Sequence, residues 1–281
     1  MIQFNNISFA YENKTPIFKN LNWEICESKQ NNFIHFIMSP SGYGKTSLFK
    51  IILNLIKPQQ GNIQIKNDTR IAYVPQEDVL FEHLSIFENA TFFQNLKSRK
   101  SEFNNELFNE YAKVLGLDSQ ILKSNKSINQ LSGGQKRKIS LLRALSLNPN
   151  IILLDEPTTG LDAQVKMEFL LQLKMIAYRY NILVLYITHH FEEPSLIGDK
   201  IHYLLKNTDG VINKITSQSV EDFKNIPPCL EAAYLVDFPV NRIEKGYYQE
   251  KTFIPNLDGT FYKREFNGHI QIFSPSGTLL N

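Results

Sequence analysis

The sequence predicts an α/β fold in which buried strands deliver polar residues to one edge of a sheet. Three short apolar runs predict it: Phe33–Met38, Ile151–Asp155 and Ile182–Ile187 have the pattern of strands covered on both faces. A helical pattern follows the first run over residues 47–56, and another follows the second over residues 163–180. Because ligands bind at the carboxyl ends of such strands, the residues directly after each run are the first candidates for a functional site.

Composition and charge exclude several classes of protein. The chain has 281 residues, enough for one large domain and a small one, and its 42% hydrophobic and 21% charged residues are typical of globular proteins. The formal net charge of +2 argues against a dedicated nucleic-acid binder. We see neither a secretory signal nor an apolar run long enough to span a bilayer. Cys26 and Cys229 lack metal-ligand spacing, so we expect both to be reduced and structural in a cytoplasmic protein.

The N-terminal quarter of the chain predicts more strands. Residues 2–11 alternate loosely and end at Tyr11, and residues 17–26 alternate cleanly, as a strand with one solvated face does. Two further strands are expected at Ile63–Ile65 and Ile71–Val74, and the second of these runs into Pro75-Gln76.

A glycine-rich stretch, Ser39–Thr46, joins the apolar strand to the first helical pattern. Gly42 and Gly44 allow the backbone to curl so that successive N–H groups face phosphate oxygens. Lys45 can reach the β- and γ-phosphates, and the Thr46 hydroxyl can ligate Mg²⁺. The complete strand, loop and helix context predicts a phosphate-binding loop.

Two residues of this loop depart from its usual pattern. Ser39 stands where the pattern has glycine, and it must adopt the geometry of the turn, at a cost if glycine torsions are required there. Tyr43 is large for a loop that lies against phosphate.

Helical patterns occupy most of residues 85–150. One runs from the N-cap candidate Ser85 to Asn95, and the next covers residues 103–116 and ends at Gly116. We expect a polar-faced helical segment inserted between strands.

A serine and a glycine pair, Ser132-Gly133-Gly134, begin a further helix that is expected to reach Leu147. Such a helix end exposes backbone N–H groups and the positive pole of the helix dipole, so it attracts anions. The basic residues 136–138 follow directly. They indicate a solvated turn of this helix, with a nucleic-acid patch as the alternative.

The two later strand ends carry candidate catalytic groups. The strand 151–155 delivers Asp155 and Glu156 to its carboxyl edge. The next strand ends in Thr188-His189-His190, and a histidine beside a phosphate site is a candidate for function.

The last quarter of the chain differs from the rest in its residue pattern. Residues 201–205 and 211–215 predict a hairpin with Asp209-Gly210 as its turn. After the linker 225–228, residues 229–281 are rich in aromatic residues and short alternating runs, which predicts a small β-rich appendage.

The order of these motifs resembles that of the ATP-binding cassette (ABC) ATPases. The motifs that match are the phosphate loop at 39–46, Gln76, LSGGQ at 131–135, LLDEP at 153–157, GLD at 160–162 and His189. The resemblance covers residues 1–225 and implies a P-loop NTPase domain with an N-terminal β subdomain and a helical subdomain at about residues 85–150. Residues 226–281 would then form a small β-rich accessory domain.

The resemblance also implies a role for each matching residue. ATP would be bound by Tyr11, which stacks on adenine, and by Ser39, Ser41, Gly42, Tyr43, Gly44, Lys45, Thr46, Ser47, Ser132, Gly133, Gly134, Gln135 and Asp162. Glu156 would be the general base, His189 the switch histidine, and Lys45 and Gln76 further catalytic groups. Mg²⁺ would be held by Thr46, Gln76 and Asp155. His190 stands where an aspartate is common in the family.

The implied function is ATP hydrolysis that energises a membrane transporter. The expected partners are a second copy of the cassette or a paralogous one, transmembrane permease subunits and a solute-binding protein, on the inner face of the cell membrane. Residues 230–241 are similar to the start of the accessory barrel of importers of iron, polyamines, sugars and oxyanions, with a dimerisation tail as the alternative. We therefore expect import of ferric iron or another small solute. A subunit of an exporter is the second possibility, and a non-transport ABC protein the third.

Overall fold

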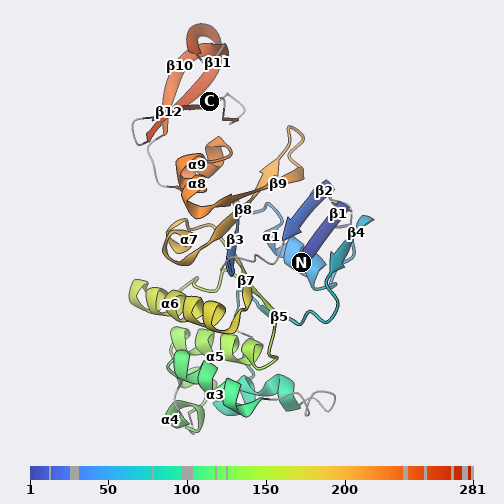
Figure 1. Ribbon diagram of the computed structural model, residues 1–281, viewed down its shortest axis with the longest axis vertical. Helices are drawn as coiled ribbons and strands as arrows, with labels where there is room; N and C mark the ends of the chain where they lie inside the picture. Colours follow the sequence, from blue (N-terminus) through green and yellow to red (C-terminus); the bar gives the residue numbers. More distant parts are fainter. Residues whose placement is uncertain are drawn as a thin grey trace.

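A computed structural model gives the structure of the chain (Figure 1). It describes residues 1–12, 14–25, 32–77, 79–95, 104–117, 119–124, 126–236, 240–249, 252–266, 269–273 and 278–279. Cys26 lies outside the described residues, whereas Cys229 is free and buried.

A mixed sheet of nine strands forms the centre of the fold, in the order β4-β1-β2-β9-β8-β3-β7-β6-β5. Its parallel part consists of β3 (Ile34–Met38), β5 (Ile71–Val74), β6 (Ile151–Asp155), β7 (Leu183–Thr188) and β8 (Lys200–Lys206). Every residue of β3, β6 and β7 is buried, which is why these strands read as continuous apolar runs. The predicted α/β fold with its parallel strands is confirmed.

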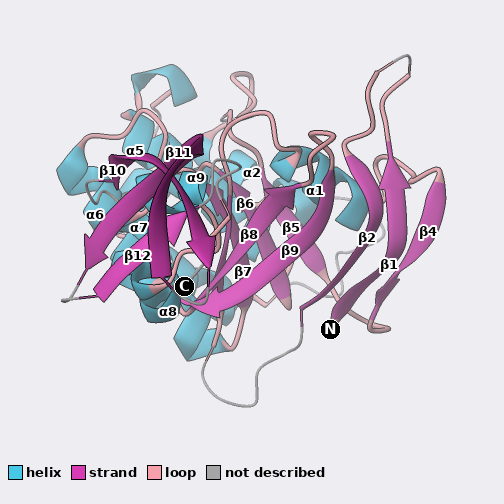
Figure 2. Cartoon of the chain, turned by 90° about the horizontal axis from the view of Figure 1, so that it is seen from above, coloured by secondary structure: helices cyan, strands magenta, loops and turns pink. Residues whose placement is uncertain are grey.

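The remaining strands of this sheet are β1 (Ile2–Phe9), β2 (Phe18–Ile25), β4 (Gln60–Ile65) and β9 (Ile212–Ser219). Strands β1, β2 and β4 pair antiparallel and lie together at one side of the molecule, away from α5 and α6 (Figure 2). The predicted solvated face of β2 is confirmed by its alternation of buried and exposed residues. The predicted hairpin is confirmed as the antiparallel pair β8–β9.

Five of the described helices match predicted ones, four of them with shifted ends, and the other four, each of six residues or fewer, were not predicted. The described helices are α1 (Lys45–Ile52), α2 (Ile86–Ala90), α3 (Asn105–Val114), α4 (Ser119–Leu122), α5 (Gly133–Leu145), α6 (Ala163–Tyr180), α7 (Glu192–Ile197), α8 (Val220–Asn225) and α9 (Leu230–Leu235). Helix α1 begins two residues before the predicted range and ends at Ile52 instead of residue 56. Helix α2 has the predicted N-cap at Ser85, but it ends at Ala90 and is followed by a 3₁₀ turn over Phe92–Asn95.

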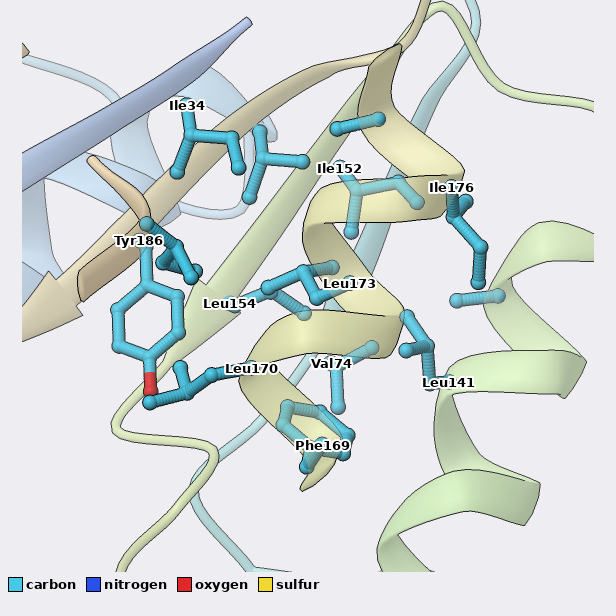
Figure 3. Close-up of a cluster of buried hydrophobic side chains, with 14 of the residues drawn as sticks. Ile34, Val74, Leu141, Ile152, Leu154, Phe169, Leu170, Leu173, Ile176 and Tyr186 are labelled. Atoms are coloured by element: carbon cyan, nitrogen blue, oxygen red, sulfur yellow. The ribbon is translucent and has the colours of Figure 1, made fainter. Parts of the chain in front are cut away.

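The core beside the functional site lies between the sheet and α6, with α5 behind it (Figure 3). Its buried side chains come from strands, from α6 and from α5: Ile34, Val74, Ile152, Leu154, Tyr186, Phe169, Leu170, Leu173, Ile176 and Leu141. Helix α6 places its apolar residues at helical spacing on this face. The helix that follows β6 is thus fixed to the strand that carries Asp155.

The C-terminal strands form a separate antiparallel sheet of three strands: β10 (Val240–Gln249), β11 (Thr252–Phe266) and β12 (His269–Phe273). This sheet fits the β-rich character predicted for residues 229–281, but the stretch begins with the helix α9, which the sequence did not predict. The domain boundary at residue 226 stays a prediction. Within the described part of the chain, no helix combines the length and apolar character needed to cross a membrane.

Candidate functional site

The loop between β3 and α1 has the backbone that phosphate binding requires. Gly42 and Gly44 have φ values of 80° and 82°, in the left-handed region that favours glycine. A Cβ on Gly44 would lie 2.4 Å from Ile17 Cγ2, so a side chain there would collide with the neighbouring segment. The two glycines therefore set both the curl of the loop and its close approach to the rest of the domain.

Ser39 accommodates the loop without glycine torsions. It is fully buried and is not among the residues with positive φ. The backbone strain that the sequence left open is therefore absent, because the turn does not require a left-handed residue at this position.

Lys45 is held over the loop by backbone carbonyls. Its Nζ donates to Ser39 O at 2.7 Å and to Pro40 O at 3.1 Å, and only 7% of the residue is exposed. Burial lowers the pKa of Lys45, and the charges of Glu156 and Asp155 oppose this shift. Two backbone contacts thus hold the Lys45 cation at the loop.

Asp155, at the end of β6, faces the first turn of α1. Thr46 Oγ1 donates to Asp155 Oδ2 at 2.9 Å, and the Tyr73 hydroxyl donates to the same oxygen at 3.4 Å. Burial raises the pKa of Asp155, while the hydrogen bond from Thr46 lowers it. Burial, followed by the Asp155 charge, raises the pKa of Tyr73 to about 12. A hydroxyl and a carboxylate at this distance are hard oxygen donors of the kind that Mg²⁺ prefers.

The Glu156 carboxylate contacts side chains from two other segments of the chain. Gln76 Nε2 donates to Glu156 Oε2 at 3.3 Å, and His189 Nδ1 lies 3.0 Å from Glu156 Oε1. A carboxylate can only accept, so Nδ1 of His189 carries a proton in this contact. The backbone of Glu156 has a φ of 44°, an uncommon left-handed conformation for a residue with a side chain.

These residues surround a cavity of about 320 Å³. Its lining consists of Ile17, Ser41, Gly42, Gly44, Lys45, Thr46, Ser47, Gln76, Asp155, Glu156 and Ile187. Nine of these were expected from the sequence, and only Ile17 and Ile187 were not. The structure therefore brings together the loop, the Gln76 segment and the end of β6, which are far apart along the chain.

Several other predicted residues lie around this cavity without lining it. The Tyr11 hydroxyl lies 3.2 Å from Ser47 Oγ, and its ring meets the Phe9 ring edge-on at 4.9 Å. The Tyr43 ring lies 3.9 Å from Lys206 Nζ and outside the cavity lining, so its size does not fill the loop. Burial raises the pKa of Tyr43, with a smaller contribution from the charge of Glu231.

The serine–glycine stretch forms the predicted helix end elsewhere on the molecule. Ser132 is the N-cap of α5 in a reciprocal capping box with Gln135. A Cβ on Gly134 would lie 2.5 Å from Val165 Cγ1, so this position has room only for glycine. Asp162 caps α6 by accepting from two backbone N–H groups. None of the residues 132–135 or Asp162 belongs to the lining of the described cavity.

The solvated turn predicted at residues 136–138 is wrong for Arg137, which is buried. It is 4% exposed, and its guanidinium donates to Pro75 O at 2.9 Å and to Gln76 O at 2.6 Å. Its position in the sequence could have indicated this burial, because Arg137 lies three residues after Gly134 and four before Leu141, on the buried face of the helix. The arginine joins α5 to the segment that positions the Gln76 side chain.

The chain is similar to known transport proteins over most of its length. The family model described as "ABC transporter" matches residues 18–159. The spermidine/putrescine import ATP-binding protein PotA of Fusobacterium nucleatum is 35% identical over 209 residues, covering 71% of this chain and 54% of the relative. The molybdate/tungstate import ATP-binding protein WtpC of Pyrococcus abyssi is 31% identical, covering 69% and 58%. The chain thus spans little more than half the length of these two relatives.

Solved structures agree on the fold. The cassette MJ0796, a bacterial ABC transporter cassette in a dimeric structure, matches with a TM-score of 0.60 and 28% identity over 78% of this chain and 99% of the other. The structure of cbiO1 from Clostridium perfringens, part of the transporter complex cbiONQ, matches with a TM-score of 0.67 and 23% identity, covering 80% and 90%.

A further relative, PotA of Clostridium acetobutylicum, is 30% identical, covering 85% of this chain and 70% of its own length. Together with the geometry of the loop and of the strand ends, these similarities establish that the chain belongs to the ABC transporter family.

Proposed function

We propose that this chain is the ATP-hydrolysing, nucleotide-binding subunit of a membrane transporter that imports a small solute. The observation that carries the proposal is the cavity described above. In it the Lys45 ammonium, the Thr46–Asp155 pair and the Glu156 carboxylate lie beside the glycine-rich loop. Phosphoryl transfer to water requires positioning, neutralised charge and an oriented nucleophile, and these groups can supply all three.

The phosphates of ATP are proposed to lie on the loop. Its backbone N–H groups and the α1 N-terminus would bind phosphate oxygens, and Lys45 would neutralise part of their charge. Thr46 and Asp155 fit Mg²⁺ as oxygen ligands, with Gln76 beside them in the lining of the cavity. When bound, Mg²⁺ would supply charge neutralisation at the phosphates.

Glu156 is proposed as the general base. It lines the cavity, and its two carboxylate oxygens contact Gln76 and His189, which orient the side chain. A water molecule in line with the γ-phosphate would give one proton to Glu156 as its oxygen bonds to phosphorus. The bond from the γ-phosphorus to the bridging oxygen would break, leaving ADP and phosphate.

A second cassette is proposed to complete the site. Ser132, Gly133, Gly134 and Gln135 lie at the N-terminus of α5, outside the cavity of their own chain. An exposed helix N-terminus binds anions, so α5 of one copy would contact the γ-phosphate held by the other. Asp162 would lie at the same interface. Two identical or paralogous cassettes would then bind two ATP molecules between them, and closure would depend on contacts made only with ATP.

A transmembrane permease is proposed as the partner that uses this cycle, with the cassette peripheral on the inner face of the membrane. The relatives above are import ATP-binding proteins by name, which supports import over export. A candidate docking region is a second cavity of about 660 Å³, lined among others by Phe87, Ala112 and Leu117. Phe87 is 45% exposed and lies on α2, in the helical segment that follows Gln76.

The identity of the transported solute and the presence of a solute-binding protein are the most specific parts of this proposal. The names of the relatives mention polyamines and the oxyanions molybdate and tungstate, so a small charged solute is the best-supported class. Ferric iron receives no support from these names and stays a prediction of the sequence.

The test uses Glu156→Gln, which keeps the shape of the side chain and removes the base. With ATP the variant is expected to form a stable dimer in size-exclusion chromatography with light scattering. The same protein with ADP, and the variant that also carries Ser132→Arg, should stay monomeric. A Glu156→Gln protein that stays monomeric with ATP, alone and with its membrane fraction, would contradict the scheme.

The partner is identified by affinity purification of the same variant from native membranes with ATP, followed by mass spectrometry. A multi-span permease, and with it a solute-binding protein, is the expected result. Ribosomal or DNA-repair proteins without a permease would overturn the transport assignment while leaving the ATPase intact.

A further inference from the structure

One buried carboxylate close to the site has no part in the scheme above. Glu193 lies on α7, four residues after His189, and is completely buried. Thr158 Oγ1 donates to Glu193 Oε1 at 2.5 Å, and Lys166 Nζ lies 2.9 Å from the same oxygen. Thr158 is also buried, and the Lys166 side chain is 17% exposed.

The direction of each hydrogen bond in this cluster follows from the groups present. Glu193 Oε1 accepts from the Lys166 ammonium, and the single hydroxyl proton of Thr158 goes to Glu193 as well. The Tyr186 hydroxyl, 3.2 Å from Thr158 Oγ1, must therefore be the donor in that contact. Burial, followed by the Glu193 charge, raises the pKa of Tyr186 well above its usual value. The result is a directed chain of polar contacts from β7 through Thr158 to α7.

This chain of contacts joins the segments that carry the site residues. Thr158 lies two residues after Glu156, and Lys166 lies in the first turn of α6 after its cap. Glu193 belongs to the segment that leaves β7 directly after His189. The unusual φ of Glu156 requires surrounding structure to hold it. The Glu156 N–H donates to Ile187 O at 3.0 Å, and Glu156 O accepts from Thr159 N at 3.2 Å, so the turn that contains Thr158 is hydrogen-bonded to Glu156 itself.

Packing alone does not explain an ionised pair at this place. A buried ion pair costs desolvation free energy, and apolar side chains of similar volume often stabilise a fold as well or better. What the polar chain adds is direction, because each contact fixes the angle of a side chain as well as its position.

We propose that Glu193 is a positioning residue for ATP hydrolysis. Through Thr158 it fixes the turn that carries Glu156. Since Glu193 and His189 share one segment, the same contact aligns His189 with Glu156. This inference rests on the proposed function, in which Glu156 is the base, but the alignment itself can be measured without hydrolysis.

The test compares three variants of the purified full chain. Thr158→Val removes the hydroxyl and keeps the shape, and Thr158→Ser keeps the hydroxyl. Thr91→Val is the matched control, because Thr91 is 4% exposed and its hydroxyl donates to Phe87 O at 2.8 Å, in the helical segment. We expect Thr158→Val to lower kcat about tenfold or more with the ATP dissociation constant within about twofold, since misalignment affects chemistry more than binding. Thr158→Ser should restore most of kcat, and Thr91→Val should lose similar thermal stability at unchanged kcat.

Alignment is read separately from the ring-nitrogen NMR signals of His189, assigned with His189→Gln. Thr158→Val and Glu193→Gln should both shift these signals, and Thr91→Val should not. Unchanged His189 signals in Thr158→Val, or a kcat no lower than that of Thr91→Val, would overturn the positioning role. A wild-type chain that binds no ATP would instead contradict the proposed function, and the NMR comparison would still decide the alignment.

Discussion

Two histidines meet inside the central sheet, and they predict that the fold loses stability in mild acid. His202 Nε2 lies 3.1 Å from His35 Nδ1, and the two residues are 1% and 2% exposed. The indole N–H of Trp23 lies 3.2 Å from His202 Nδ1 and can only donate. His202 therefore carries its proton on Nε2 and donates it to His35, so the arrangement requires both rings to be neutral.

The magnitude follows from the pKa of His35. Burial, followed by the charge of Lys200, lowers it from 6.5 to about 4. Between these values the unfolded chain binds more protons than the native one, so stability rises with pH across this window and is lost as pH falls. At pH 5 His35 alone is expected to cost about 2 kcal/mol of the free energy of unfolding relative to pH 7.5. Burial also lowers the pKa of His202 well below its usual value, which acts in the same direction.

The assay is urea unfolding at pH 7.5, 6 and 5, followed by the fluorescence of Trp23, the only tryptophan of the chain. His35→Gln keeps an acceptor for His202 and cannot be protonated, so wild type should lose about 2 kcal/mol more than this variant between pH 7.5 and 5. His83→Gln, at an exposed histidine, is the control and should behave like wild type. Equal losses for wild type and His35→Gln would refute the reasoning.

Three further changes have outcomes set by the geometry of single positions. Gly44→Ala should abolish binding of a fluorescent ATP analogue, because its φ is 82° and its Cβ would lie 2.4 Å from Ile17 Cγ2. Gly134→Ala should lower the free energy of unfolding in urea by about 1–3 kcal/mol, since its Cβ would lie 2.5 Å from Val165 Cγ1, and Val165→Ala in the same chain should restore most of it. Ser39→Ala should raise the free energy of unfolding by about 1 kcal/mol at unchanged ATP affinity, because its buried hydroxyl has no hydrogen-bond partner among the described residues. A Ser39→Ala chain that loses ATP affinity would show that the hydroxyl contacts the ligand.

The elements with strong local signals were predictable from the sequence. Helix α6 runs over the predicted residues because Asp162 caps its start and Asn181, in the left-handed region with a φ of 53°, ends it. The phosphate loop was equally predictable, since Gly42 and Gly44 fix its backbone locally.

Features that depend on distant contacts were not predictable. The burial of Arg137 depends on the carbonyl of Gln76, which lies 61 positions away. The position of the Tyr43 ring outside the cavity depends on Lys206, which ends β8, a strand that lies beside β3 but comes much later in the sequence. Helix α9 is short, and its aromatic surroundings in the sequence favoured strand. For Arg137 and Tyr43 the deciding partner comes from tertiary packing, which a local pattern does not contain.

The guanidinium of Arg137 makes the helical segment and the Gln76 segment one mechanical unit. Its two donors hold the carbonyls of Pro75 and Gln76, while the Gln76 amide reaches Glu156 from the other side. A tilt of α5 as a rigid body would therefore pull on the Gln76 backbone and open its 3.3 Å contact with Glu156. A movement of the outer helices would in this way change the position of the Glu156 carboxylate through the hydrogen bonds of Arg137 and Gln76.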